Sequence, residues 1–211
     1  NIRKALLFIL PTNGGEAGLI LVALFAGLAL PVTAAQILWV NMVTSITLDL
    51  ALAFEPAEDG VMRRPPRPAH EPLITRLLFA RIAYITLLMI GATFFVYHWE
   101  LGRGNGLDVA RTAVVNMLVM SEVFYLFNVR HFTASALSLQ ALRGNAVALW
   151  ACGITLALQA LLTYWPPMQA LFGTAPLDAL AWALIVGLAA AKFGIVEVEK
   201  SWLRRRGVQR L

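Results

Sequence analysis

The sequence is poor in charge and has almost no cysteine. Charged residues make up 14% of its 211 residues and hydrophobic residues 59%, whereas soluble domains are about a quarter charged. The mean hydropathy is +0.72. Such a chain leaves no room for a soluble catalytic domain of about 100 residues beside its apolar segments. Because Cys152 is the single cysteine, no disulfide can form within the chain, and cysteine usage does not indicate whether the protein faces an oxidising or a reducing compartment.

Signals for nucleotide, nucleic acid and soft-metal binding are also missing. The sequence contains no Gly-rich phosphate-binding loop. Its net charge of +5 would suit nucleic acid, but the basic residues lie at the ends of apolar segments, so we expect no nucleic acid partner. The three histidines, His70, His98 and His131, fall in a loop or at segment ends and are expected to be solvated.

Six apolar segments are each long enough to cross a bilayer as a helix, which takes about 20 residues. Backbone groups in lipid must be hydrogen-bonded internally, which favours helices, and the segments lack the alternation typical of membrane β-barrels. The sequence therefore predicts an all-α fold, a polytopic membrane helix bundle with six transmembrane helices in one domain, residues 1–211. The segments cover residues 5–30, 36–54, 77–99, 109–128, 146–165 and 179–198.

Lysine and arginine predict the orientation. With the N-terminus inside, only Arg103 and Arg111 of the 17 basic residues lie on the outer side. Cytoplasmic loops carry such an excess, so both termini are predicted to be cytoplasmic, in an integral protein of the plasma (inner) membrane that contacts the lipid bilayer. Arg81 and Lys192 lie slightly inside their segments and are expected to extend outward to the interface.

The first segment carries polar groups near its middle. A carboxylate at this depth is costly and marks a functional site by default. Asn13 and Glu16 are three residues apart and share one helical face. The glycine pair between them would let the helix loosen or a neighbouring helix approach closely. The alternative is a packing notch with Glu16 paired to a basic residue, but none lies at that depth of the sequence.

The second segment carries four polar residues: Asn41, Thr44, Ser45 and Asp49. Asn41, Ser45 and Asp49 are each four apart, so on an α-helix they form one stripe with Thr44 beside it. Asp49 lies nearer the cytoplasmic end, where it could line a mouth or relay an ion instead of binding it.

The fourth segment carries Asn116, Ser121 and Glu122, with Asn128 at its inner end. Glu122 lies too far from either end to reach water, and its alternative role is a protonated carboxyl bonded to a neighbouring helix. The three segments together offer amide, hydroxyl and carboxylate oxygens without histidine or cysteine, a set that suits hard cations and argues against zinc or copper. The sequence therefore predicts a hard-cation site within the membrane.

Four stretches carry a family resemblance. They are Asn13-Gly14-Gly15-Glu16, Leu38-Trp39-Val40-Asn41-Met42-Val43-Thr44, Phe54-Glu55-Pro56 with Val61-Met62-Arg63-Arg64-Pro65-Pro66-Arg67, and Ala110-Arg111-Thr112 running on to Glu122. With these stretches the sequence resembles the C-terminal membrane half, helices five to ten, of the P-type cation-transporting ATPases, in the calcium-pump-like branch and its bacterial members.

The resemblance implies that Asn13, Glu16, Asn41, Thr44 and Glu122 coordinate the transported ion. At Ser45, calcium pumps instead have an aspartate that bridges two ions. Since affinity for hard divalent ions follows the number of carboxylates, one divalent ion, or Na⁺, K⁺ or H⁺, fits this site better than two Ca²⁺. Asp49, one turn along, could restore the missing charge.

The resemblance also implies what this chain lacks. P-type pumps phosphorylate an aspartate in Asp-Lys-Thr-Gly-Thr, and that motif is absent here. The chain alone is expected to have no catalytic residue and no bound cofactor, with Mg-ATP and the N-terminal cytoplasmic and transmembrane parts of the pump on sequence preceding Asn1. The loop over residues 59–68 would couple to the phosphorylation domain, or serve as a stiff linker near anionic lipid.

Without the resemblance, two other functions are open. One is a secondary cation transporter or channel-like protein that uses the same carboxylates without ATPase coupling, and the other is a non-catalytic membrane subunit.

Overall fold

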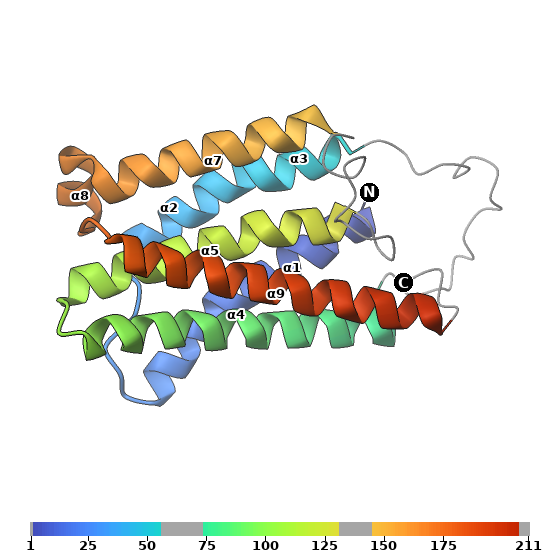
Figure 1. Cartoon of the computed structure of the whole chain (residues 1–211), viewed down its shortest axis with the longest axis horizontal. Helices are drawn as coiled ribbons and strands as arrows, with labels where there is room; N and C mark the ends of the chain where they lie inside the picture. Colours follow the sequence, from blue (N-terminus) through green and yellow to red (C-terminus); the bar gives the residue numbers. More distant parts are fainter. Residues whose placement is uncertain (1, 56–73, 131–144, 207–211) are drawn as a thin grey trace.

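The computed structural model describes residues 2–55, 74–130 and 145–206, and all regular elements within them are helical (Figure 1). Six helices are long and apolar enough to cross a membrane, which confirms the all-α six-span prediction. The elements are α1 Ile2–Phe25, α2 Ala34–Thr44, the π-helix η1 Ser45–Asp49, α3 Leu50–Ala53, α4 Arg76–Gly102, α5 Leu107–Arg130, α7 Ala146–Tyr164, α8 Pro166–Phe172 and α9 Ala179–Arg205.

The start of α1 and the end of α9 lie at the same end of the bundle, as an even number of crossings requires (Figure 1). That this end faces the cytoplasm stays a prediction, as does the particular membrane. His98 is exposed, as expected. His70, His131 and the loop over residues 59–68 lie outside the described residues.

Helix α5 is the centre of the bundle. It is buried on nearly all sides and packs against α1, α2, α4, α7 and α9. Polar side chains on such a helix need partners inside the protein. Asn116 Nδ2 donates to Thr163 Oγ1 of α7 at 3.0 Å, and Asn128 Nδ2 donates to Glu197 Oε1 of α9 at 2.8 Å. Two of the four polar residues singled out on this segment therefore tie α5 to its neighbours.

Two segment ends differ from the prediction by five residues or more. Helix α1 stops at Phe25, five residues early, and Gly27 takes a positive φ of 65° at the turn that follows. Helix α9 continues to Arg205, seven residues beyond the apolar stretch. It does so because Lys200 Nζ pairs with Glu197 Oε1 at 2.7 Å, so both charges stay inside the bundle.

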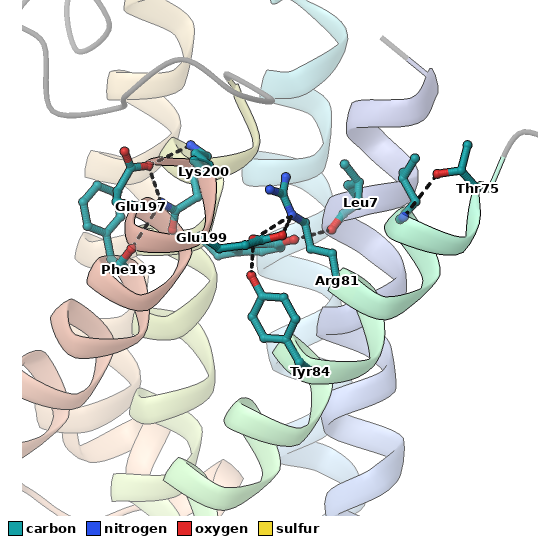
Figure 2. A network of polar contacts seen from close by, with 11 residues as sticks. Leu7, Thr75, Arg81, Tyr84, Phe193, Glu197, Glu199 and Lys200 are labelled. Atoms are coloured by element: carbon teal, nitrogen blue, oxygen red, sulfur yellow. Dashed lines mark hydrogen bonds and ion pairs between the residues drawn. The ribbon is translucent and has the colours of Figure 1, made fainter. Parts of the chain in front are cut away.

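A polar network joins α4 and α9 at the end of the bundle that carries both termini (Figure 2). Arg81 Nε lies 3.0 Å from Glu199 Oε2, and the Tyr84 hydroxyl donates to the same carboxylate. Arg81 is 3% exposed, so the expectation that it extends outward to the interface is wrong. A partner within the protein replaces the headgroup region as the environment of its charge.

The second span is fixed at the same end through Glu55. Arg130 Nε of α5 lies 3.0 Å from Glu55 Oε2, and Asn145 Nδ2, at the start of α7, donates to Glu55 Oε2 at 2.8 Å. The glutamate of the Phe54-Glu55-Pro56 stretch therefore holds the end of α3 against two neighbouring helices.

At the opposite end of the bundle, the two arginines predicted on the outer side both form contacts. Arg103 pairs with Asp178, and Arg111 Nε donates to Leu30 O at 3.1 Å. The Arg103 guanidinium holds the pKa of the exposed Asp178 carboxyl below its usual value. Asp178 also caps α9 by accepting a hydrogen bond from Ala181 N at 2.7 Å.

Helices α1 and α4 approach each other closely at the glycines of α1. A Cβ on Gly15 would lie 3.1 Å from Met89 Cβ, and one on Gly14 would lie 3.0 Å from Thr86 Oγ1. Of the two roles proposed for the glycine pair, the structure shows close approach, since α1 stays helical through it. Small residues allow such contacts between membrane helices.

Pro11 leaves a gap in the hydrogen bonding of α1, and α5 fills it. Proline has no N–H, so the carbonyl four residues earlier, on Leu7, loses its helical partner. The Tyr125 hydroxyl of α5 donates to Leu7 O at 2.8 Å, and the Tyr125 ring stacks on Phe8. Figure 2 shows Leu7 close to the network of α4 and α9.

Replacement of Gly15 by leucine should destabilise the protein by about 1–3 kcal/mol, because the new side chain overpacks the contact with Met89. The matched control is Gly187→Leu on an exposed part of α9, where nothing lies within 4 Å of an added Cβ. Thermal denaturation of the purified protein in detergent measures both. Equal denaturation midpoints for the two variants would contradict the close packing of α1 on α4.

Tyr125→Phe should cost about 1–3 kcal/mol, because it leaves the Leu7 carbonyl buried without a partner. In a Pro11→Ala background the cost should be much smaller, since residue 11 then supplies the helical N–H. A double-mutant cycle on unfolding free energies measures the coupling, with about 0.5–3 kcal/mol expected. Additive effects would show that the tyrosine does not replace the proline's missing bond.

Candidate ion-binding site

Glu16 of α1 and Asn41 of α2 are in direct contact. Asn41 Nδ2 donates to Glu16 Oε2 at 2.7 Å and to Ile37 O of its own helix at 3.1 Å. The Glu16 side chain is buried, with 4% of the residue exposed. Its second oxygen, Oε1, has no hydrogen-bond partner in the part of the chain that the structure describes. One carboxylate oxygen is therefore held in place while the other remains available to a ligand.

A π-helical turn interrupts the second span between Ser45 and Asp49. We predicted a regular α-helix here, with polar residues on one stripe at four-residue spacing. A π-turn has i→i+5 bonding, which breaks that spacing, and such turns are frequently found at functional sites. The Ser45 N–H reaches the carbonyls of both Asn41 and Met42, so the change of bonding begins next to the predicted ligands.

The π-turn is anchored to α7 by a pair of threonines. Thr47 Oγ1 donates to Val43 O at 2.7 Å and shares a second 2.7 Å hydrogen bond with Thr155 Oγ1 of α7. Thr47 was not among the predicted site residues. The sequence signal that could have identified Thr47 was its spacing of three residues from Thr44. A threonine in a membrane helix, however, more often bonds back to a carbonyl of its own helix. Thr44 itself does so, donating to Val40 O at 3.0 Å.

Glu122 brings α5 into the same cluster. It is 2% exposed, and its carboxyl lies beside the Thr44 hydroxyl and within electrostatic reach of Glu16 and Asp49. Its Oε2 has no hydrogen-bond partner among the described residues. Oxygens from α1, from α2 with η1, and from α5 are thus gathered at one level of the bundle.

Asp49 and Ser45 lie at the edge of this cluster, and Asn13 lies three residues before Glu16 on α1. The half-buried Asp49 carboxyl bonds to Ser45 and acts on Glu16. Ser45 and Asn13 are exposed on their helices. The structure therefore brings Glu16, Asn41, Thr44, Asp49 and Glu122 together and leaves Asn13 and Ser45 on an uncovered surface.

Sequence reasoning misplaced Lys192, which we expected to extend outward to the interface. The residue is 3% exposed, and its Nζ donates to the backbone oxygen of Ser121 at 2.9 Å. Glu122 is the neighbouring carboxyl that acts on this ammonium. The error follows from the underestimated length of α9, because in the helix that reaches Arg205 residue 192 lies near the middle.

The cluster is chemically a set of hard oxygen donors. It offers carboxylate, amide and hydroxyl oxygens, which bind Ca²⁺, Mg²⁺ and alkali cations better than soft metals. Within the described ranges, no three His, Cys, Asp or Glu side chains are grouped closely enough to hold one metal ion by themselves. A cation bound at this cluster would therefore need neutral oxygens beside the carboxylates.

Comparisons with known proteins agree with this chemistry. Residues 29–202 match the family model described as "Cation transporting ATPase, C-terminus". The chain is 42% identical over 191 residues to the probable cation-transporting ATPase F of Mycobacterium tuberculosis, covering 90% of this chain and 21% of that protein. It is 36% identical to the cation-transporting ATPase pma1 of Synechocystis (87% and 21% covered) and 31% identical to a calcium-transporting ATPase of Bacillus subtilis (90% and 21% covered).

The chain spans about a fifth of the length of these relatives. The family model covers most of its residues, including all the helices from α2 to α7. The chain therefore belongs to the P-type cation-transporting ATPases and corresponds to their C-terminal membrane region.

Proposed function

We propose that this chain binds and translocates the cation of an ATP-driven pump, at a site formed by Glu16, Asn41, Thr44, Asp49 and Glu122. The observation that carries the proposal is the contact of Glu16 with Asn41 beside Glu122, where each carboxyl keeps one buried oxygen without a partner. A dehydrated cation would satisfy both oxygens. It would also offset the mutual repulsion of two carboxylates held in a low-dielectric medium.

The exposed polar residues indicate where the rest of such a pump would pack. Asn13 and Ser45 lie at mid-span and are exposed in this chain. Polar side chains are rarely left facing lipid. We therefore infer that the N-terminal transmembrane part covers the surface formed by α1 and η1. That part would supply the remaining oxygens, which is consistent with the absence of a complete three-residue metal group within the described part of this chain.

The oxygen donors of the site indicate a class of cation, the hard cations, and not one particular ion. Relatives of this chain are named both as calcium-transporting and, more broadly, as cation-transporting ATPases. Ser45 supplies a hydroxyl where the resemblance to calcium pumps implies a bridging carboxylate, and this favours one divalent ion, or Na⁺, K⁺ or H⁺, over two Ca²⁺. Phosphorylation and nucleotide binding would reside in the other four-fifths of the pump.

Glu16→Gln in the full-length pump should abolish phosphorylation from ATP that depends on the transported cation, because the amide removes the charge that binds it. Phosphoenzyme formation is measured with radiolabelled ATP against separate titrations of Ca²⁺, Mg²⁺, Na⁺ and K⁺. The matched control is Asp178→Asn at the far end of the bundle, which removes a carboxylate and keeps a good helix cap. Unchanged cation dependence in Glu16→Gln would refute the assignment of the site.

A further inference from the structure

We propose that Lys192 is a tethered counter-cation of Glu122, which competes with the transported cation for this carboxylate and so weakens the affinity of the site. The proposal rests on the proposed function, since it assigns a role within that site. It concerns a residue of α9, a helix that contributes none of the predicted ligands.

The position of the ammonium is fixed by α5. Lys192 Nζ donates to the carbonyl oxygen of Ser121, the residue directly before Glu122, at 2.9 Å. It also lies 5.6 Å from the centre of the Tyr125 ring, three residues further along α5. A carbonyl on one side and an aromatic ring on another hold the ammonium in the interface between α5 and α9.

Neither contact supplies a negative charge. A buried ammonium without an anionic partner is strongly unfavourable, and an ammonium has three N–H donors, of which the Ser121 carbonyl accepts one. The carboxyl that acts on Lys192 is Glu122, whose Oε2 has no hydrogen-bond partner among the described residues. The charge of Lys192 is therefore felt by the same carboxyl that would bind the ion, although the two groups form no direct ion pair.

The balance of charges at the site indicates how Lys192 would affect cation binding. The carboxyls of Glu16 and Asp49 both act on Glu122, so the cluster holds three carboxyls and one ammonium. When all are ionised, two negative charges remain, which one divalent ion balances. A cation that approaches Glu122 is repelled by the nearby ammonium, which already lowers the negative potential at this carboxylate, so binding is weaker than the number of carboxylates alone implies.

The test uses the full-length pump and the half-saturating concentration for phosphorylation, with whichever of Ca²⁺, Na⁺ or K⁺ supports it in the wild type. Lys192→Met should lower this concentration at least tenfold, because repulsion and competition are both removed. Lys192→Gln, which removes the charge and keeps a donor for Ser121 O, should show the same gain. Lys192→Arg keeps the charge and should show no gain.

Two further variants separate a charge effect from a packing effect. Lys200→Met removes another buried lysine of α9, one paired with Glu197, and should leave the half-saturating concentration within about threefold of the wild type. Adding Glu122→Gln to Lys192→Met should remove the gain, because the carboxylate under competition is gone. If Lys192 only filled space, its replacement would leave cation binding unchanged or make it weaker, and would not strengthen it.

Unchanged or weakened cation affinity in both Lys192→Met and Lys192→Gln would overturn the role of Lys192, as would an equal gain in Lys192→Arg or Lys200→Met. These results leave the proposed function standing, because the pump would still require its cation. Phosphorylation of the wild-type pump that is independent of every cation tested would instead reject the proposed function, and the role of Lys192 with it.

Discussion

A polar group inside the bilayer must find its partner within the protein, and this constraint organises the whole bundle. On α5, Asn116 bonds to Thr163 and Tyr125 bonds to the carbonyl that Pro11 leaves free. Among the residues that the structure describes, the buried oxygens of Glu16 and Glu122 that lack a hydrogen-bond partner belong to carboxyls that act on one another. The cation of the proposed function would satisfy both of these neighbouring acceptors and offset their like charge.

The site combines a rigid helix with an irregular one. Glu122 sits on α5, which neighbouring helices enclose on nearly all sides. Thr44 ends α2 where the π-turn begins, and the turn is held to α7 through Thr47 and Thr155. Irregular backbone at membrane depth is tolerated where it is buried or lines a polar cavity. A small change in the π-turn would therefore move oxygens relative to a fixed carboxylate, which is what binding and release of an ion require.

Hydropathy was sufficient to predict the six spans, because apolar runs of about 20 residues have few alternatives in lipid. Polar residues within apolar segments, without a partner in the same segment, were sufficient to identify the three helices that carry Glu16, Asn41 and Glu122. The structure brings these three residues together. The π-turn could not be predicted, because no residue type specifies i→i+5 bonding. The stripe of Asn41, Ser45 and Asp49 therefore assumed the spacing of a regular α-helix. The length of α9 was missed because Glu197 and Lys200 neutralise each other only once the helix has folded.

Two features of the site reduce its expected affinity for a cation. Ser45 supplies a hydroxyl where the resemblance to calcium pumps implies a carboxylate, and the ammonium of Lys192 lies within electrostatic reach of Glu122. Both lower the negative charge available to a cation: Ser45 because it carries no charge, and Lys192 because its positive charge opposes that of Glu122. A pump must release its ion as well as bind it, and a carboxylate cluster without compensation would bind a divalent ion tightly in low dielectric. In the proposed site, a counter-cation carried by α9 would give the bundle its own competitor for Glu122, so that release of the ion would not depend on the π-turn alone.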